Sequence, residues 1–173
     1  EITCRDWSSD VCSSDLSGKQ DYYSLDYGDL HILVLNTEVN YDKKSKQYEF
    51  AKYDLKNTDK KWKIVIAHEH AYCGGGHGEN KDLIYMTKTI FEPNKVNMFI
   101  SGHSHFYQHN FVNGIHHIII AGGGAPLVEP KDRDYTIKSE RKHCYGIADI
   151  SPSEFKLVAY DIWGGIIDEI ILK

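Results

Sequence analysis

The chain has 173 residues, of which 41% are hydrophobic, and this length and composition suit a single domain with a buried core. Its formal net charge is −5 and it contains no lysine or arginine run, which argues against a nucleic-acid partner. No stretch approaches roughly 18 consecutive apolar residues, so the sequence contains no candidate membrane span.

The first sixteen residues, EITCRDWSSDVCSSDL, differ in character from the rest. They show no apolar period, and a disordered polar leader is one interpretation. They also resemble the translation of a widely used sequencing-library adapter, so we expect residues 1–16 to be a non-native leader. The native sequence would then begin near Ser17, with its upstream part missing. Without the leader, the formal charge is about −2, because these residues carry four acids and one base. Only Cys73 and Cys144 remain, too few for a disulfide framework.

From Ser17 onward, strand-like and helix-like segments alternate. Apolar runs and turn residues predict, in order, strands over 22–27 and 30–35 joined at Gly28-Asp29, a helix over 47–56, a strand over 62–67, a helix over 83–91 and a strand over 96–100. This alternation predicts an α/β fold. In open α/β sheets ligands bind at the carboxyl ends of the strands, which is where the polar residues of this chain gather.

The second half of the chain changes to β structure. Asn113-Gly114, the strongest short-range hairpin signal, separates expected strands over 107–112 and 115–121. A glycine loop, Gly122–Pro126, follows, and the charged segment 128–140 is expected to be solvated. Three further strands, over 143–150, 154–161 and 166–172, are expected to form a meander.

The ten histidines divide into two groups. Five lie within expected strands and are best read as surface or hydrogen-bonded structural residues: His31, His109, His116, His117 and His143. His116 and His117 are adjacent in one strand, so they should point to opposite faces. The other five follow buried strands or lie in glycine-rich loops, where rigid elements could hold metal ligands: His68, His70, His77, His103 and His105. Spacing alone leaves both a metal site and ordinary polar loops open.

Three familiar catalytic patterns do not fit. The segment His68-Glu69-His70-Ala71-Tyr72 has tyrosine where the His-Glu-x-x-His zinc motif needs its second histidine. Ser104 lacks the Gly-x-Ser-x-Gly setting of a nucleophile elbow. The glycine run 74–78 lacks the Gly-Lys-Ser/Thr ending of a phosphate-binding loop, so a nucleotide cradle is not expected.

Several segments, taken in order, resemble the second half of the calcineurin-like metallophosphoesterases, most closely the purple-acid-phosphatase-like bacterial members. Gly102-His103-Ser104-His105 matches the Gly-His-x-His signature, and the strand ending at His68 resembles the one that leads into His-x-Pro-x-Tyr. The entry hairpin at 22–28, the helix beginning at Gln47 and the glycine loop 122–126 also resemble family segments. Residue 70, proline in the family pattern, is histidine here, and either a supporting hydrogen-bond donor or a substrate contact is open for it.

The resemblance implies a four-layer αββα sandwich of mixed β-sheets, of which this chain would be the C-terminal portion, residues 17–173. It implies a phosphoric ester hydrolase with two metal ions (Fe, Mn or Zn) and a metal-bridged water. By resemblance, His68 and His103 would ligate one ion and His105 the other. His77 would contact phosphate or act as a general acid, although a loop histidine without a role is equally open.

The family's Asp-x-His, Gly-Asp-x-x-Asp and Gly-Asn-His-Asp/Glu motifs would precede Tyr22, and none of them occurs there in this chain. We therefore expect a fragment of a binuclear phosphoesterase acting on phosphate esters, with the remaining ligands upstream and little activity of its own. A non-catalytic metal-binding or interaction module is the main alternative. A mononuclear zinc hydrolase using Glu69 or Glu79 is another. The resemblance to exported acid phosphatases favours a location outside the cytoplasm over one inside it.

Overall fold

Residues 21–173 are described by a computed structural model, and the leader expected over residues 1–16 lies outside them. The elements, in chain order, are β1 (Tyr23–Tyr27), β2 (Leu30–Val34), α2 (Lys46–Asn57), β3 (Trp62–Ala67), α3 (Lys81–Met86), the π-helical turn η1 (Thr87–Phe91), β4 (Met98–Ser101), β5 (Tyr107–Val112), β6 (Ile115–Ile120), β7 (Thr136–Glu140), β8 (Cys144–Ile150), β9 (Phe155–Asp161) and β10 (Ile166–Leu172).

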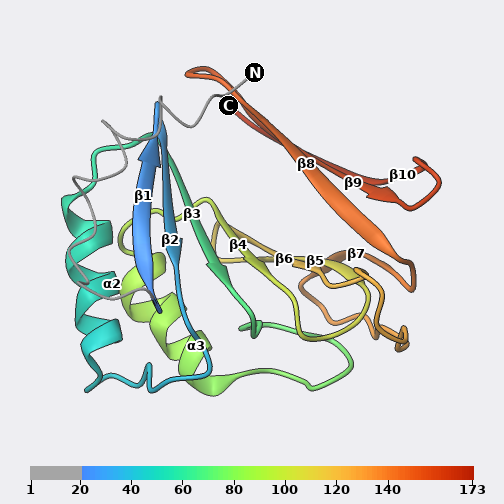
Figure 1. Ribbon diagram of the computed structural model, residues 1–173, viewed down its shortest axis with the longest axis horizontal. Helices are drawn as coiled ribbons and strands as arrows, with labels where there is room; N and C mark the ends of the chain where they lie inside the picture. Colours follow the sequence, from blue (N-terminus) through green and yellow to red (C-terminus); the bar gives the residue numbers. More distant parts are fainter. Residues whose placement is uncertain (1–20) are drawn as a thin grey trace.

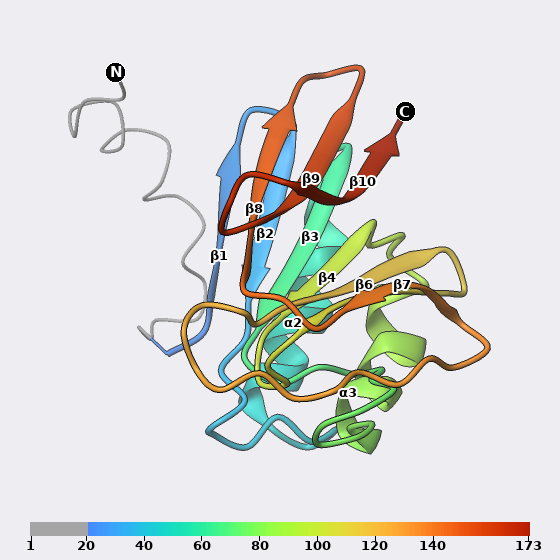
Figure 2. The same cartoon turned by 90° about the vertical axis from the view of Figure 1, so that its right-hand side faces the viewer.

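Two sheets organise the chain. The larger is mixed and has the strand order β1-β2-β3-β4-β6-β5-β7, while β10, β9 and β8 form a separate three-stranded antiparallel sheet. Strands β2, β3, β4 and β6 run parallel, so their carboxyl ends meet at one edge. Figures 1 and 2 show the helices on one face of the large sheet and the small sheet on the other. This confirms the expected mixed-sheet α/β architecture.

The alternation of side chains explains the three layers. Leu33, Val65 and Phe99 are paired across β2, β3 and β4, and they belong to the core shared with α2, α3 and η1. Their neighbours Ile64 and Met98 point the other way and pack in the core shared with β9 and β10. Burying one such side chain fully contributes roughly 1.5–3 kcal/mol, so both faces of the sheet need a covering layer.

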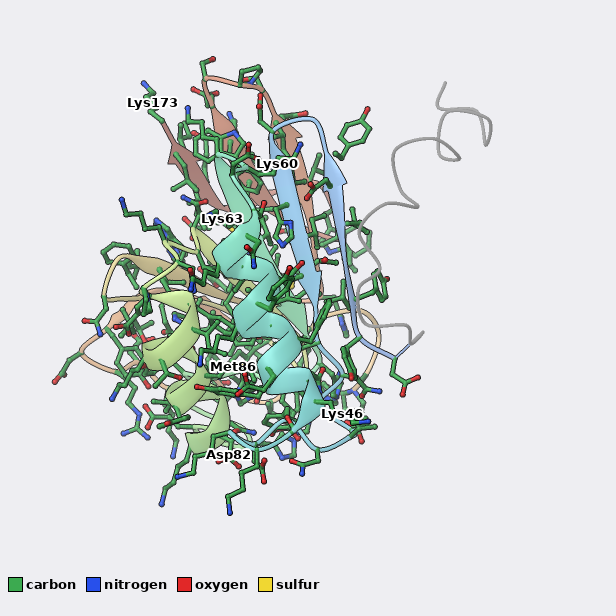
Figure 3. All side chains as sticks on the ribbon, turned by 90° about the vertical axis from the view of Figure 1, so that its left-hand side faces the viewer. Lys46, Lys60, Lys63, Asp82, Met86 and Lys173 are labelled. Carbon is green, nitrogen blue, oxygen red and sulfur yellow. The ribbon has the colours of Figure 1, made fainter. Side chains whose placement is uncertain are left out.

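The helices begin where the sequence supplies caps. Ser45 accepts a hydrogen bond from the Tyr48 backbone N–H at 3.0 Å, and Asn80 accepts from the first turn of α3. Figure 3, seen from the helix side, shows α2, marked by Lys46, and α3, marked by Asp82 and Met86, lying over the sheet. The helix expected over 83–91 consists of two joined segments, the α-helix α3 and the π-helical turn η1. Within residues 21–173, none of the helices combines the length and apolar character needed to cross a membrane.

Segment 128–140 is solvated as expected, because none of its residues is buried. Its last five residues nevertheless form β7, which pairs with β5 at the edge of the large sheet. An edge strand tolerates charged side chains because one side faces water. Lys138 and Glu140 pair at 2.9 Å, and Thr136 donates to buried Asn110 at 2.8 Å.

The histidines expected to be structural have distinct environments. His109 bonds to Asp168 on β10 at 2.8 Å and to His116 at 2.8 Å, which ties the two sheets together. His143 bonds to the Gly122 carbonyl at 2.9 Å. His117 points to the opposite face from His116, as expected, but it is not hydrogen-bonded: it is buried, and neither ring nitrogen has a partner within residues 21–173. Burial and, secondarily, the charge of His116 lower the pKa of His117 to about 3, so it is neutral.

His31 is the centre of a buried ionic network on the helix side of the sheet. Its Nδ1 lies 2.7 Å from Asp26 Oδ1 and its Nε2 lies 2.8 Å from Asp54 Oδ2. Asp54 also accepts a hydrogen bond from Ser24 at 2.7 Å. Burial opposes the charged imidazole, but the hydrogen bonds and charges of Asp54 and Asp26 outweigh burial and raise the pKa of His31 above 6.5.

This network predicts a stability that depends on pH. Because the pKa of His31 is raised on folding, its contribution is complete below about pH 6.5 and is lost as the pH rises through the folded-state pKa. Within that window the free energy of unfolding should fall by up to about 1.4 kcal/mol per pH unit. Urea unfolding of the wild type and of His31→Gln between pH 6 and 9 measures this slope. An equal slope in both proteins would contradict the assignment.

Candidate metal centre

The site is built where two neighbouring parallel strands end together. Ala67, the last residue of β3, is paired with Ser101, the last residue of β4. The two chains stay in contact one residue further, because the Gly102 N–H donates to the His68 carbonyl at 2.9 Å. The turn that carries His103 is thereby fixed beside His68. The adjacency of His68 and His103, which the family resemblance implied, is a direct consequence of this register.

Two ring nitrogens converge at this edge. His68 Nε2 lies 3.2 Å from His103 Nδ1, and the two rings are nearly perpendicular, at 79°. Two imidazoles bound to one tetrahedral zinc ion at 2.0–2.1 Å place their nitrogens about 3.3 Å apart. The observed separation therefore fits a pair of ligands to a single ion, and it also fits a hydrogen bond between the rings.

The backbone of the turn is strained at a histidine and not at its glycine. His103 has φ of +67°, whereas Gly102 lies outside the left-handed region. A non-glycine residue held there costs on the order of 1–3 kcal/mol. Burial, followed by the charges of His77 and His68, lowers the pKa of His103, which favours the neutral imidazole that a metal needs.

His105 is directed elsewhere. Its Nδ1 lies 3.0 Å from the carbonyl oxygen of Pro126, in the glycine loop that follows β6. A histidine that donates one ring N–H to a carbonyl has its other nitrogen, here Nε2, free to accept a metal ion. His105 thus joins neither His68 nor His103. Its geometry is compatible with a second ion on its own side of the turn.

His77 comes to the site from the glycine loop that follows β3. The centre of its ring lies 4.0 Å from that of His103, and its side chain is exposed. Three of the four residues named as site candidates, His68, His77 and His103, therefore cluster together.

His70, which could have been a hydrogen-bond donor or a substrate contact, is buried with 3% of its surface exposed. Its Nε2 lies 2.8 Å from Ser104 Oγ, so it supports the turn and is not available to a substrate. Burial and, secondarily, the charge of His103 lower the pKa of His70 to about 4.

No group of three or more His, Cys, Asp or Glu side chains within residues 21–173 is arranged to hold a metal ion. The nearby carboxylates are occupied otherwise. Glu69 accepts hydrogen bonds from Tyr41 at 3.3 Å and from Asn80, and Glu79 accepts one from Tyr135 at 2.6 Å. The residues described thus supply imidazole pairs but no carboxylate to complete or bridge a site.

Sequence reasoning missed the polar residues that hold the site loops. Gln108 and Asn110 on β5 are fully buried. Gln108 accepts from the Gly74 N–H at 2.9 Å and donates to the Lys131 carbonyl at 3.0 Å, while Asn110 donates to the Tyr72 carbonyl at 3.1 Å. Two amides spaced two residues apart in a strand share one face. This spacing in the sequence could have indicated that this face of β5 binds the polar backbone of loops and not an apolar core.

Comparisons with known proteins agree with this architecture. The family model for calcineurin-like phosphoesterase matches residues 2–107. Purple acid phosphatase 7 of Arabidopsis thaliana is 27% identical over 118 residues, which cover 66% of this chain and 36% of that protein. Purple acid phosphatase 3 of the same plant is 28% identical over 119 residues, covering 65% and 32%. The chain spans about a third of the length of these relatives.

Two solved structures share the fold. The yellow lupin (Lupinus luteus) purple acid phosphatase PPD1 superimposes with a TM-score of 0.76 at 23% identity, covering 87% of this chain and 32% of that one. GAP50, the anchor in the inner membrane complex of Plasmodium, superimposes with a TM-score of 0.73 at 15% identity, covering 88% and 53%. With the family model matching more than half of its residues, the chain belongs to the calcineurin-like phosphoesterase family.

Proposed function

We propose that this chain carries part of the site of a binuclear metal-dependent phosphoesterase that hydrolyses phosphate esters. The observation that supports this most strongly is the convergence of His68 Nε2 and His103 Nδ1, 3.2 Å apart, where β3 and β4 end. Family membership and the purple acid phosphatase relatives support the reaction class. Because the chain spans about a third of those relatives, the carboxylates of the site would come from further sequence.

Each histidine has a separate role in this proposal. His68 and His103 would hold one ion, and His105, through Nε2, would hold the second. Such ions, when bound, clamp the phosphate ester and supply Lewis-acid activation of water. His77 is exposed beside His103, and from there it would donate a proton to the departing alcohol oxygen. Neutral His103 suits its role, since a protonated imidazole cannot bind a metal.

Exposed apolar surface supports the proposal that this chain is part of a larger domain. Among residues 21–173, β8 pairs only with β9, and several of its side chains are exposed. Tyr145 is 44% exposed, Ile147 is 49% exposed and Ile150 is 39% exposed. An apolar edge strand of this kind is usually covered in a stable protein. We infer that further strands of a phosphoesterase domain cover it. The match to only 36% of the length of purple acid phosphatase 7 supports this inference.

The alternatives make different predictions. A non-catalytic module complete in itself would be a cooperatively folded unit with stoichiometric metal, and thermal melting with metal analysis distinguishes it from a fragment. A mononuclear zinc hydrolase has less support, because the carboxylates of Glu69 and Glu79 are hydrogen-bonded to other side chains.

The gene sequence upstream of Ser17 tests directly whether this chain is a fragment. We expect a Gly-Asn-His-Asp/Glu motif there. From the resemblance to exported acid phosphatases we also propose a location outside the cytoplasm.

Zinc binding tests the paired imidazoles. Calorimetric titration of the full chain with Zn²⁺ should show about one ion per chain, with a dissociation constant weaker than about 1 μM, because a carboxylate-poor site binds weakly. His68→Ala should abolish this binding. Hydrolysis of p-nitrophenyl phosphate should stay at the rate of the buffer with metal alone, since the ligand set is incomplete.

The control is His116→Ala, which removes the other close imidazole pair, 2.8 Å apart, and should leave zinc binding unchanged. Zinc binding that survives His68→Ala but not His116→Ala would place the ion elsewhere. Robust metal-dependent hydrolysis by the chain itself would show that the site is complete without further sequence.

The strained turn predicts a separation of stability from binding. Asparagine tolerates the left-handed conformation better than histidine does, so His103→Asn should leave the free energy of unfolding within about 1 kcal/mol of the wild type. The same variant should weaken Zn²⁺ binding at least tenfold, because one imidazole is lost. Urea unfolding and zinc titration measure the two effects. If His103→Asn loses stability in parallel with its zinc affinity, His103 is required for folding and does not act as a metal ligand.

A further inference from the structure

The hydroxyl of Ser104 lies at a junction of three segments. Ser104 is completely buried between His103 and His105. Its Oγ lies 2.8 Å from His70 Nε2 and accepts a hydrogen bond from the His77 backbone N–H at 3.4 Å. The thiol of Cys73 lies 3.6 Å away. One side chain on the turn after β4 thus contacts the extension of β3 and the loop that carries His77.

The loop is shaped to bring its backbone to this hydroxyl. Gly76 has φ of +56°, and a Cβ at that position would overlap Ser104 Oγ. At the other end of the loop, a Cβ on Gly74 would overlap the Lys131 carbonyl. The loop is therefore pressed against β5 and the 128–135 segment on one side and against Ser104 on the other. Of these contacts, the Ser104 hydrogen bond is the one made by His77 itself.

His70 completes the junction at an energetic cost. Its Nδ1 is buried and forms no hydrogen bond within residues 21–173. Leaving such a buried group unpaired is unfavourable. The one hydrogen bond of its ring is to Ser104, and with the His77 N–H donating to Oγ, the hydroxyl proton is free for His70 Nε2. His70 therefore accepts the hydroxyl proton and leaves an Oγ lone pair free to accept from the His77 N–H.

We propose that Ser104 is a positioning residue that holds His77 beside His103, and that His70 orients the Ser104 hydroxyl for this purpose. The importance of His77 rests on the proposed function, whereas the junction itself does not. Without the hydroxyl, the loop keeps its anchor at Gln108 but loses the contact at His77. His77 would then sample positions away from the paired imidazoles.

Hydrogen exchange tests the junction in the metal-free full chain. Ser104→Ala should speed exchange of the His77 amide at least tenfold, because its acceptor is gone, while the Gly74 amide, bonded to Gln108, keeps its protection. His70→Leu should have the same effect in smaller degree. His70→Gln retains a side-chain amide able to bond Ser104 and should restore protection to within about twofold of the wild type.

Ser101→Ala is the matched control, since Ser101 is also buried but donates to the Ile118 carbonyl at 3.3 Å, away from the loop. Zinc titration of the wild type provides a separate measurement, because it tests the proposed function and not the junction. Unchanged His77 exchange in Ser104→Ala, or equal effects of His70→Gln and His70→Leu, overturns the junction. A wild type that binds no zinc overturns the proposed function instead, and the exchange data then decide the junction alone.

Discussion

The parallel pairing of β3 with β4 is the constraint on which the candidate site depends. Its register sets Ala67 opposite Ser101, and the hydrogen bond from Gly102 to the His68 carbonyl continues it beyond the sheet. The pairing is itself fixed by alternating side chains that must be buried on both faces. A shift of one residue would turn Val65 and Phe99 to the wrong face, so the core indirectly sets the distance between His68 and His103.

The sequence predicted features governed by local rules and by periodicity. Asn113 and Gly114 both have positive φ, as the two-residue hairpin requires, and the strands on either side pair as expected. The grouping of His68, His77 and His103 followed from strand ends and glycine loops. What could not be predicted depends on contacts distant in sequence. β7 forms because β5 offers an open edge, and nothing within segment 128–140 reveals that edge.

The same limit applies to the strained and unsatisfied groups. The left-handed conformation falls on His103 and not on Gly102, although glycine is the residue that local rules favour there. The role of His70 was open in the sequence, since only the folded chain brings Ser104 within 2.8 Å. Strained backbone conformations and unpaired buried groups of this kind concentrate at functional sites, where the surrounding structure compensates for them. In contrast, both ring nitrogens of His31, on the helix side of the sheet, have carboxylate partners.

The central claim is that His68 and His103 act as a pair toward one ion. Anomalous X-ray diffraction at the zinc edge, from crystals of the full chain grown with Zn²⁺, tests it most directly. The account predicts a zinc peak about 2.0–2.1 Å from both His68 Nε2 and His103 Nδ1, with the distance between these two nitrogens close to the present 3.2 Å. Zinc found only at other histidines, or the two rings hydrogen-bonded with no ion between them at saturating zinc, would contradict it.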